Sequence, residues 1–140
     1  YPAVYGFWKW TGIFRSLVLD SDLQKKIGLY IQQSKLIMDQ IESRLQAALA
    51  ASPRIIVWGT GQLAMKLLVE TSLAHAEILA FVDNNSINHG RVLRNIPIIG
   101  PDQLEGLNAP ILITTLLHHR AIAEQIRAMH IKNEIIFLGE

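Results

Sequence analysis

The sequence predicts an α/β protein in which a long helix precedes a small, mostly parallel sheet of five strands. Two observations carry this prediction. Over residues 54–140, short apolar runs alternate with segments of helical spacing, which is the pattern of strands joined by right-handed crossovers. Ahead of them, residues 21–51 carry an apolar stripe at helical spacing.

The apolar runs are expected to be the strands, because they are continuous enough to be buried on both faces of a sheet. In chain order they are RIIVWG, AEILAFVD, NIPIIG, APILITT and NEIIFLG. The segments expected to be helical are GQLAMKLLVETSL, PDQLEGL, which Pro101 opens, and HHRAIAEQIRAMH. This succession predicts the strand order 3-2-1-4-5 and a small Rossmann-like domain over residues 53–140.

The long helix is expected within residues 20–52. Asp20, Ser21 or Asp22 can cap its start, and Pro53 stops it. At 1.5 Å per residue its length is about 45 Å, more than the width of a small domain. Its stripe is therefore expected to pack on the sheet domain, on an upstream domain, or on a second copy of the chain. A homodimer through the long helix is one of the expected partnerships.

The first segment, residues 1–19, is aromatic and irregular, with Trp8 and Trp10 on either side of Lys9. We interpret it as a hydrophobic anchor against the rest of the chain or an upstream part. A stacking platform for bases or sugars is the alternative. Because the chain begins with Tyr1 rather than Met, we interpret it as a piece of a longer protein, with an upstream domain as a partner.

Composition restricts the function classes. The 140 residues are 50% hydrophobic and 18% charged, with a net charge of +1. This balance argues against a nucleic-acid partner, which requires a basic surface. The absence of cysteine excludes disulfides and cysteine-based zinc sites. No apolar run reaches the roughly 18 residues of a membrane span. No membrane partner and a cytoplasmic location are therefore expected.

The most informative stretch is the glycine turn in "RIIVWGTGQLAMKLL". Gly59 and Gly61 follow a strand and open a helix, and Ala64 occupies the third small position of a G-x-G-x-x-G/A pattern. The first glycine permits a tight turn, the second lets a phosphate approach the backbone, and the third lets helix and strand pack closely. The amino terminus of the helix then offers free N–H groups and a positive dipole end to an anion.

A carboxylate ends the second expected strand in "FVDNN". Asp83 lies where dinucleotide-binding folds carry an acid that accepts hydrogen bonds from a ribose diol. The alternative is that Asp83 caps the following turn, with Asn84 and Asn85 as ordinary turn formers. Both interpretations stay open at this point.

The fourth expected strand ends at Thr114 and Thr115, beside the glycine turn in the predicted strand order. These threonines and His118 are therefore candidates for the same crevice. His118 and His119 equally fit solvated residues in the first turn of the next helix. The remaining histidines show no metal-ligand spacing and are interpreted as surface residues: His75, His89 and His130.

Signatures of catalysis are missing. The Tyr-x-x-x-Lys pair of short-chain dehydrogenases is absent, since Tyr30 and Lys35 have the wrong spacing and lie in another element. There is no G-x-S-x-G elbow, no G-x-x-x-x-G-K-[ST] loop and no carboxylate pair near the glycine turn. No catalytic residue and no metal are therefore expected, and a binding domain is the simplest interpretation.

The segments "IIVWGTGQLAMKLL", "ILAFVDNNSINHGRVLRNIPIIGPDQL" and "APILITT" resemble a recurring nucleotide-binding module. The resemblance is to the carboxy-terminal domain of sugar C-methyltransferases. The same segments are similar to the nucleotide-binding domains of bacterial sugar acyltransferases and of nucleotide-sugar dehydratases and epimerases. The resemblance covers residues 54–140. The long helix would suit a link from an upstream methyltransferase domain.

The resemblance implies that Gly59, Thr60, Gly61 and Gln62 contact a diphosphate, and Asp83 the ribose or base. The ligand would be a nucleotide or nucleotide-sugar in a non-catalytic domain of a larger enzyme of sugar or polysaccharide biosynthesis. S-adenosylmethionine (SAM) would bind only the missing upstream domain. The alternatives are an NAD(P)-binding domain of an oxidoreductase, dehydratase or epimerase, and a ligand-free structural or dimerisation module. Ala64 and the five strands favour a nucleotide over NAD(P).

Overall fold

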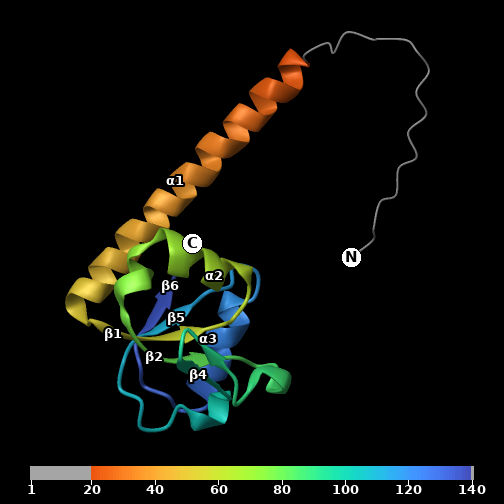
Figure 1. Ribbon diagram of the computed structural model, residues 1–140. Coiled ribbons are helices and arrows are strands. Elements are labelled where there is room, and N and C mark those ends of the chain that lie inside the picture. The colour runs from red at the N-terminus through yellow and green to blue at the C-terminus, as the bar shows by residue number, and fades with distance from the viewer. Residues whose placement is uncertain (1–19, 140) are drawn as a thin grey trace, which may run out of the picture. The chain divides into compact units, whose positions relative to one another are not determined.

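The structure is a computed structural model that describes residues 20–139 (Figure 1). The interpretation of the aromatic segment, with Trp8 and Trp10, lies outside the described residues. Contacts divide the chain into two units between Ser34 and Lys35. This division falls inside the long helix, whereas the sequence suggested boundaries at both of its ends. Within the described part, no helix is long and apolar enough to cross a lipid bilayer.

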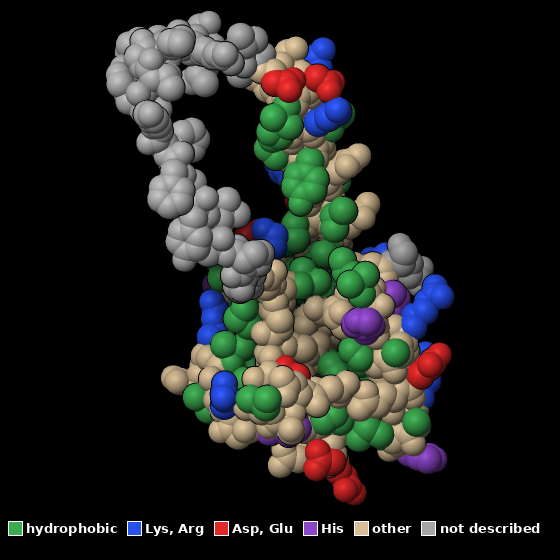
Figure 2. Space-filling view, turned by 90° about the vertical axis from the view of Figure 1, so that its right-hand side faces the viewer, with side chains coloured by type: hydrophobic (Ala, Val, Ile, Leu, Met, Phe, Trp, Pro, Cys, Tyr) green, Lys and Arg blue, Asp and Glu red, His purple; other side chains and the backbone are tan. Residues whose placement is uncertain are grey.

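Helix α1 (Ser21–Ala51) has the expected bounds. The Asp20 carboxylate caps it by accepting hydrogen bonds from the N–H groups of Asp22 at 3.0 Å and Leu23 at 2.9 Å. Towards its carboxyl end, Ile41 and Leu45 are fully buried. Its earlier apolar side chains are exposed, and Figure 2 shows hydrophobic side chains following one another along the helix.

The sheet has six strands in the order β3-β4-β2-β1-β5-β6. All neighbouring pairs are parallel except β3 with β4. The strands are β1 (Arg54–Trp58), β2 (Glu77–Val82), β3 (Val92–Leu93), β4 (Ile96–Ile99), β5 (Ile111–Ile113) and β6 (Ile135–Phe137). Two further α-helices, α2 (Gln62–Glu70) and α3 (His119–Ala128), and three 3-10 turns, η1 (Ser72–His75), η2 (Ser86–Asn88) and η3 (Pro101–Gln103), complete the described elements.

The predicted count of five strands is wrong, and the order differs from the predicted one by the added strand β3. This strand has two residues, too few to show a period in the sequence. It forms a hairpin with β4 through Arg94 and Asn95, which adopt positive φ angles of 51° and 64°. The segment before β4 therefore folds back as an antiparallel edge instead of a plain loop.

The expected helix over PDQLEGL is also reduced, to the three residues of η3. Pro101 opens it as predicted, and the Leu104 side chain is buried where the turn ends. Gly106 then adopts a φ of 86°, which a right-handed helix cannot contain. The link from β4 to β5 consequently holds the 3-10 turn η3 and a loop instead of a crossover α-helix.

Two apolar layers sandwich the sheet. On one face, the carboxyl half of α1 and α2 pack on the strands through Ile41, Leu45 and Leu67. On the other face, α3 packs through Ile122 and Ile126 (Figure 1). Because the parallel strands all point the same way, the loops after β1, β2, β4 and β5 gather at one edge of the sheet.

Candidate functional site

The glycine turn, residues 59–62, leaves β1 at this edge and leads directly into α2. Gly59 has a φ of +108°, and its N–H donates to the Val82 carbonyl at 2.7 Å. A Cβ at this position would lie 2.8 Å from the Thr114 Oγ1 atom. Glycine is therefore required here both by the backbone angle and by the close approach of the Thr114 side chain.

The second glycine of the turn, Gly61, is required neither by its backbone angles nor by its neighbours. Gly61 has a φ of −77° and a ψ of −174°, angles that any residue adopts, and a Cβ there would meet no atom within 4 Å. It is the N-cap of α2, and no side chain in the described part of the chain caps the helix. The first N–H groups of α2 are thus open on the side where a larger residue would stand. Gln62, the first helical residue, is exposed.

The third small residue, Ala64, is fully buried in the layer between α2 and the sheet. Close helix–strand packing is the role that the G-x-G-x-x-G/A pattern gives this position. The three small residues of the turn therefore serve three distinct purposes: a backbone angle, an open helix end and a packed contact.

Asp83 stands at the end of β2, opposite the turn, and its carboxylate is held by three donors. The Thr60 hydroxyl and the Asn88 amide donate to Oδ2, the latter at 2.9 Å, and the Asn85 N–H donates to Oδ1 at 2.9 Å. The last of these bonds is the turn cap that the sequence left open as an alternative. A carboxylate offers about four acceptor positions, so one position on Oδ1 remains.

The same bonds fix the charge state of Asp83. Partial burial raises the pKa of this carboxyl, but the hydrogen bonds from Thr60, Asn85 and Asn88 and the nearby His89 outweigh it and leave the pKa below its usual value. Folding thus favours the charged form. The stabilisation is present above the unfolded-state pKa, near 4, and is lost as the pH falls through the lower folded-state pKa.

We therefore expect wild-type protein to lose stability between pH 5 and pH 3 more steeply than the Asp83→Asn variant. Urea unfolding at a series of pH values measures both slopes, with Asp102→Asn, an exposed carboxylate on η3, as the matched control. Equal slopes for wild type and Asp83→Asn would contradict the assigned charge network.

Thr114 directly follows β5 and is buried. Its hydroxyl donates to the Trp58 carbonyl at 2.9 Å and lies 3.2 Å from the Gly59 carbonyl. This side chain therefore holds the start of the glycine turn against the end of β5. Thr115 is half-buried and His118 is exposed as the N-cap of α3. Among the described residues, no hydrogen bond joins either of them to the glycine turn.

Asn84, next to Asp83, turns to the opposite side. Its amide pairs reciprocally with the amide of Gln125 on α3, at 3.0 Å and 3.2 Å. The structure thus brings Gly59, Thr60, Asp83 and Thr114 together by direct contacts. It directs Asn84 to α3.

The sequence did not point to three residues that contact Asp83 or Asn84: Asn88, His89 and Gln125. The interpretation of His89 as a surface residue is wrong, since it is half-buried and its Nε2 lies 2.7 Å from the Asp83 carbonyl. The asparagine-rich run after Asp83 was a usable signal for Asn88, whereas nothing in the sequence singles out Gln125. His75 and His130 are exposed as expected, and the described residues contain no cluster of three metal-ligating side chains.

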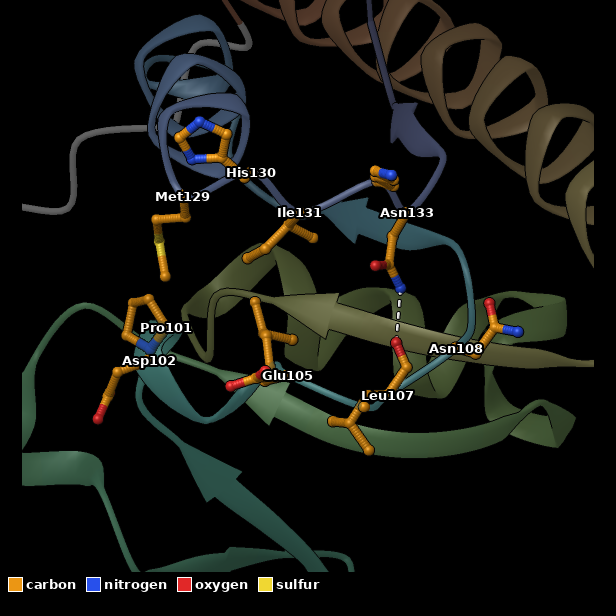
Figure 3. A pocket seen from close by; sticks show the side chains of 12 residues that line it. Pro101, Asp102, Glu105, Leu107, Asn108, Met129, His130, Ile131 and Asn133 are labelled. Carbon is orange, nitrogen blue, oxygen red and sulfur yellow. Dashed lines mark hydrogen bonds between the residues drawn. The ribbon is translucent and has the colours of Figure 1, made fainter.

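A groove of about 570 Å³ lies away from the glycine turn, between the loop after β4 and the segment that joins α3 to β6. Figure 3 shows Met129 pointing toward Pro101 across it, and Asn133 donating to the Leu107 carbonyl at 2.7 Å. None of the sequence-predicted site residues lines this groove. Its charged side chains, such as Glu105 and Lys132, carry both signs and define no ligand class.

The fold and the turn define the class: an α/β protein with an open, mostly parallel sheet, in which an uncapped helix start follows β1 at the switch point between β1 and β5. The sequence model of one family, described as C2185-like, N-terminal, matches residues 51–137. This is more than half of the chain, which therefore belongs to the C2185-like N-terminal family. Searches of curated proteins and of solved structures gave no match.

Proposed function

We propose that this chain is a small Rossmann-like domain that binds the diphosphate of a nucleotide or nucleotide-sugar at its glycine turn. The observation that carries the proposal is Gly61. Neither its backbone angles nor its surroundings demand a glycine, yet the absence of a side chain leaves the amino end of α2 open. Free N–H groups and a positive dipole end at this position suit a phosphate.

The neighbouring groups suit the rest of a nucleotide. The Asp83 carboxylate retains one acceptor position, which a ribose hydroxyl could fill. Its lowered pKa keeps it charged at neutral pH, which strengthens such a bond. Thr60 joins the turn to Asp83, which supports the proposal that the turn and the carboxylate act on one ligand.

We propose further, on the resemblance, that the domain is non-catalytic and serves a larger enzyme of sugar or polysaccharide biosynthesis, foremost a SAM-dependent methyltransferase. SAM would then bind the upstream part. NAD(P) is the alternative ligand, but the sixth strand of this sheet is a two-residue antiparallel edge. The parallel sixth strand of a complete dinucleotide fold is therefore not supplied by β3.

A ligand-free structural module is the competing function. It is favoured by one observation, the internal satisfaction of Asp83 by Thr60, Asn85 and Asn88. The two functions differ in whether the open end of α2 is ever used, and a substitution at Gly61 separates them.

Gly61→Asp is expected to abolish nucleotide binding while leaving the free protein as stable as wild type or slightly more so. An aspartate at the N-cap accepts bonds from the first N–H groups of α2, which contributes a few tenths of a kcal/mol over glycine. The same carboxylate occupies and repels the phosphate position. Thermal shift and titration calorimetry with UDP- and TDP-sugars, NAD, NADP and SAM measure both effects.

The matched controls are Gly61→Ala, which adds a Cβ without charge, and Gln40→Glu, which adds the charge at an exposed position of α1. A ligand at 100 times its Kd would stabilise wild type by about 2.7 kcal/mol. If no nucleotide shifts the unfolding temperature of wild type, the ligand-free module is the better description. Binding that Gly61→Asp leaves intact would move the site elsewhere.

A further inference from the structure

Within residues 20–139, no strand pairs with the outer edge of β6. The Ile111 N–H donates to the Glu134 carbonyl at 2.8 Å, so in a parallel pair the backbone groups of Glu134 and Ile136 face β5. Those of Ile135 and Phe137 therefore face away. The hydrogen bond from Arg44 is consistent with this orientation, since Arg44 Nη1 donates to the Phe137 carbonyl from the side away from β5, at 3.4 Å. Among the described residues, the backbone of Ile135 has no recorded partner on that side.

The two faces of the sheet are hollowed beside this edge. On the α1 face, a groove of about 400 Å³ runs along β6, and α1 contributes only small residues to it besides Arg44: Ala47, Ala48 and Ala51. On the α3 face, a hollow of about 340 Å³ is lined by His119, Arg120, Phe137 and Gly139. A strand laid along β6 would direct alternate side chains into both.

The opposite edge of the sheet is protected. It ends in β3, which has two residues and lies between the exposed side chains of Arg91 and Arg94. Short strands and flanking charges are the usual means of blocking further pairing. The β6 edge instead carries Ile135, Ile136 and Phe137, all partly exposed.

We propose that β6 is the surface on which a second copy of this chain docks, with the two β6 strands antiparallel and the sheet continuous across the dimer. In the register that pairs the outward groups of both residues, Ile135 lies opposite Phe137 of the second copy, and the two Ile136 residues lie opposite one another. Each strand then donates and accepts through its outward groups. The Phe137 carbonyl has a second lone pair, so it can accept this new hydrogen bond and retain the one from Arg44.

The side chains fit this register. Ile136 packs on the α1 face with the cluster that contains Ile41 and Leu45. Ile136 of the second copy would therefore enter the groove beside Ala47 and Ala48. Ile135 belongs to the α3 face, so its counterpart in the second copy fills the hollow at Phe137. On the α1 face the small side chains of Ala47 and Ala48 leave the room that the incoming side chain needs, and on the α3 face the hollow beside Phe137 provides it.

Charge complementarity favours a second copy over an unrelated strand. Within the groove, Arg44 stands at the carboxyl end of β6, beside the Phe137 carbonyl, and Glu134 stands at its amino end. In an antiparallel pair the amino end of one β6 lies beside the carboxyl end of the other. Glu134 of the second copy therefore lies near Arg44 of the first, and Arg44 of the second copy lies near Glu134 of the first. Such self-complementarity is what a two-fold interface requires.

Sedimentation and light scattering on the 140-residue chain test the proposal with two prolines. Ile135→Pro removes an outward N–H and no bond to β5, and it is expected to raise the dimer dissociation constant about tenfold or more. Val92→Pro is the matched control. The Val92 N–H also faces outward, because the neighbouring Arg91 carbonyl and Leu93 pair with β4. Val92 lies at the edge of the sheet opposite β6, so this variant should leave the dimer intact.

A charge exchange tests the register without a proline. Arg44→Glu is expected to weaken the dimer, and adding Glu134→Arg in the same chain should restore it. Both residues are exposed in the single chain, so circular dichroism should show unchanged folding. This pair keeps the proposal testable even if Ile135→Pro fails to fold.

The outcomes decide between arrangements. Loss of the dimer in Ile135→Pro and Arg44→Glu, with rescue by the exchange, supports β6 pairing. A monomeric wild type at high concentration overturns it. So does a dimer that these variants leave unchanged but Ile27→Lys, at an exposed position of α1, dissociates, because that result would establish the helix-mediated homodimer instead. The readout needs no nucleotide, so failure of the ligand proposal leaves this test unaffected.

Discussion

Leu45→Ala is expected to lower the free energy of unfolding by about 3 kcal/mol, whereas Leu36→Ala, nine residues earlier on the same helix, should change it by less than about 0.5 kcal/mol. Leu45 is 0% exposed and packs in the layer that contains Leu67 and Phe81. Leu36 is 62% exposed. The two variants remove the same atoms from one element, so the difference measures only the burial of the carboxyl half of α1.

Chemical unfolding monitored by circular dichroism and tryptophan fluorescence measures both values. If Leu45→Ala costs as little as Leu36→Ala, the carboxyl half of α1 does not belong to the core. The position also bears on the proposed dimer, because Arg44 and Ala48 lie close to Leu45 on α1 and line the groove beside β6.

Gly59→Ala is expected to cost about 2–4 kcal/mol, while Gly61→Ala, two residues on in the same turn, should stay within about 0.5 kcal/mol. The φ of +108° at Gly59 strains any residue with a Cβ, and that Cβ would stand 2.8 Å from Thr114 Oγ1. At Gly61 the backbone angles are ordinary and the space is open.

A double-mutant cycle separates the two causes at Gly59. Combining Gly59→Ala with Thr114→Ala removes the close contact but leaves the backbone strain, so only part of the loss should be recovered. Equal stabilities for Gly59→Ala and Gly61→Ala would contradict the positive φ. The comparison also shows that one glycine of the turn serves folding, which leaves the other free for a ligand.

Much of the fold was predictable because its signals are local. Asp20 and Pro53 mark the two ends of α1 in the sequence. The parallel strands β1, β2 and β5 appear as unbroken apolar runs because α-helices cover both faces of the sheet. The hairpin strand β3 was missed because its two residues owe their pairing to the positive φ angles of Arg94 and Asn95.

The candidate site was predictable only in part. The glycines and Asp83 follow from the pattern of a strand, a turn and a strand end. Whether a polar side chain faces a ligand or the protein depends on tertiary contacts, which leave no local trace. Thr114 turned out to fasten the glycine turn through the Trp58 carbonyl, and Asn84 pairs with Gln125, 41 residues away. Neither partner could be read from spacing.

The bond between Thr60 and Asp83 has a consequence for proton uptake. A hydroxyl has a single hydrogen, and here Asp83 receives it. A phosphate that accepted this hydrogen would take a donor from Asp83 and place a negative charge nearby, and both changes raise the pKa of the carboxyl. Nucleotide binding at mildly acidic pH would then draw protons from the buffer. Calorimetric titrations in buffers of different ionisation enthalpy would therefore give different heats for the same affinity.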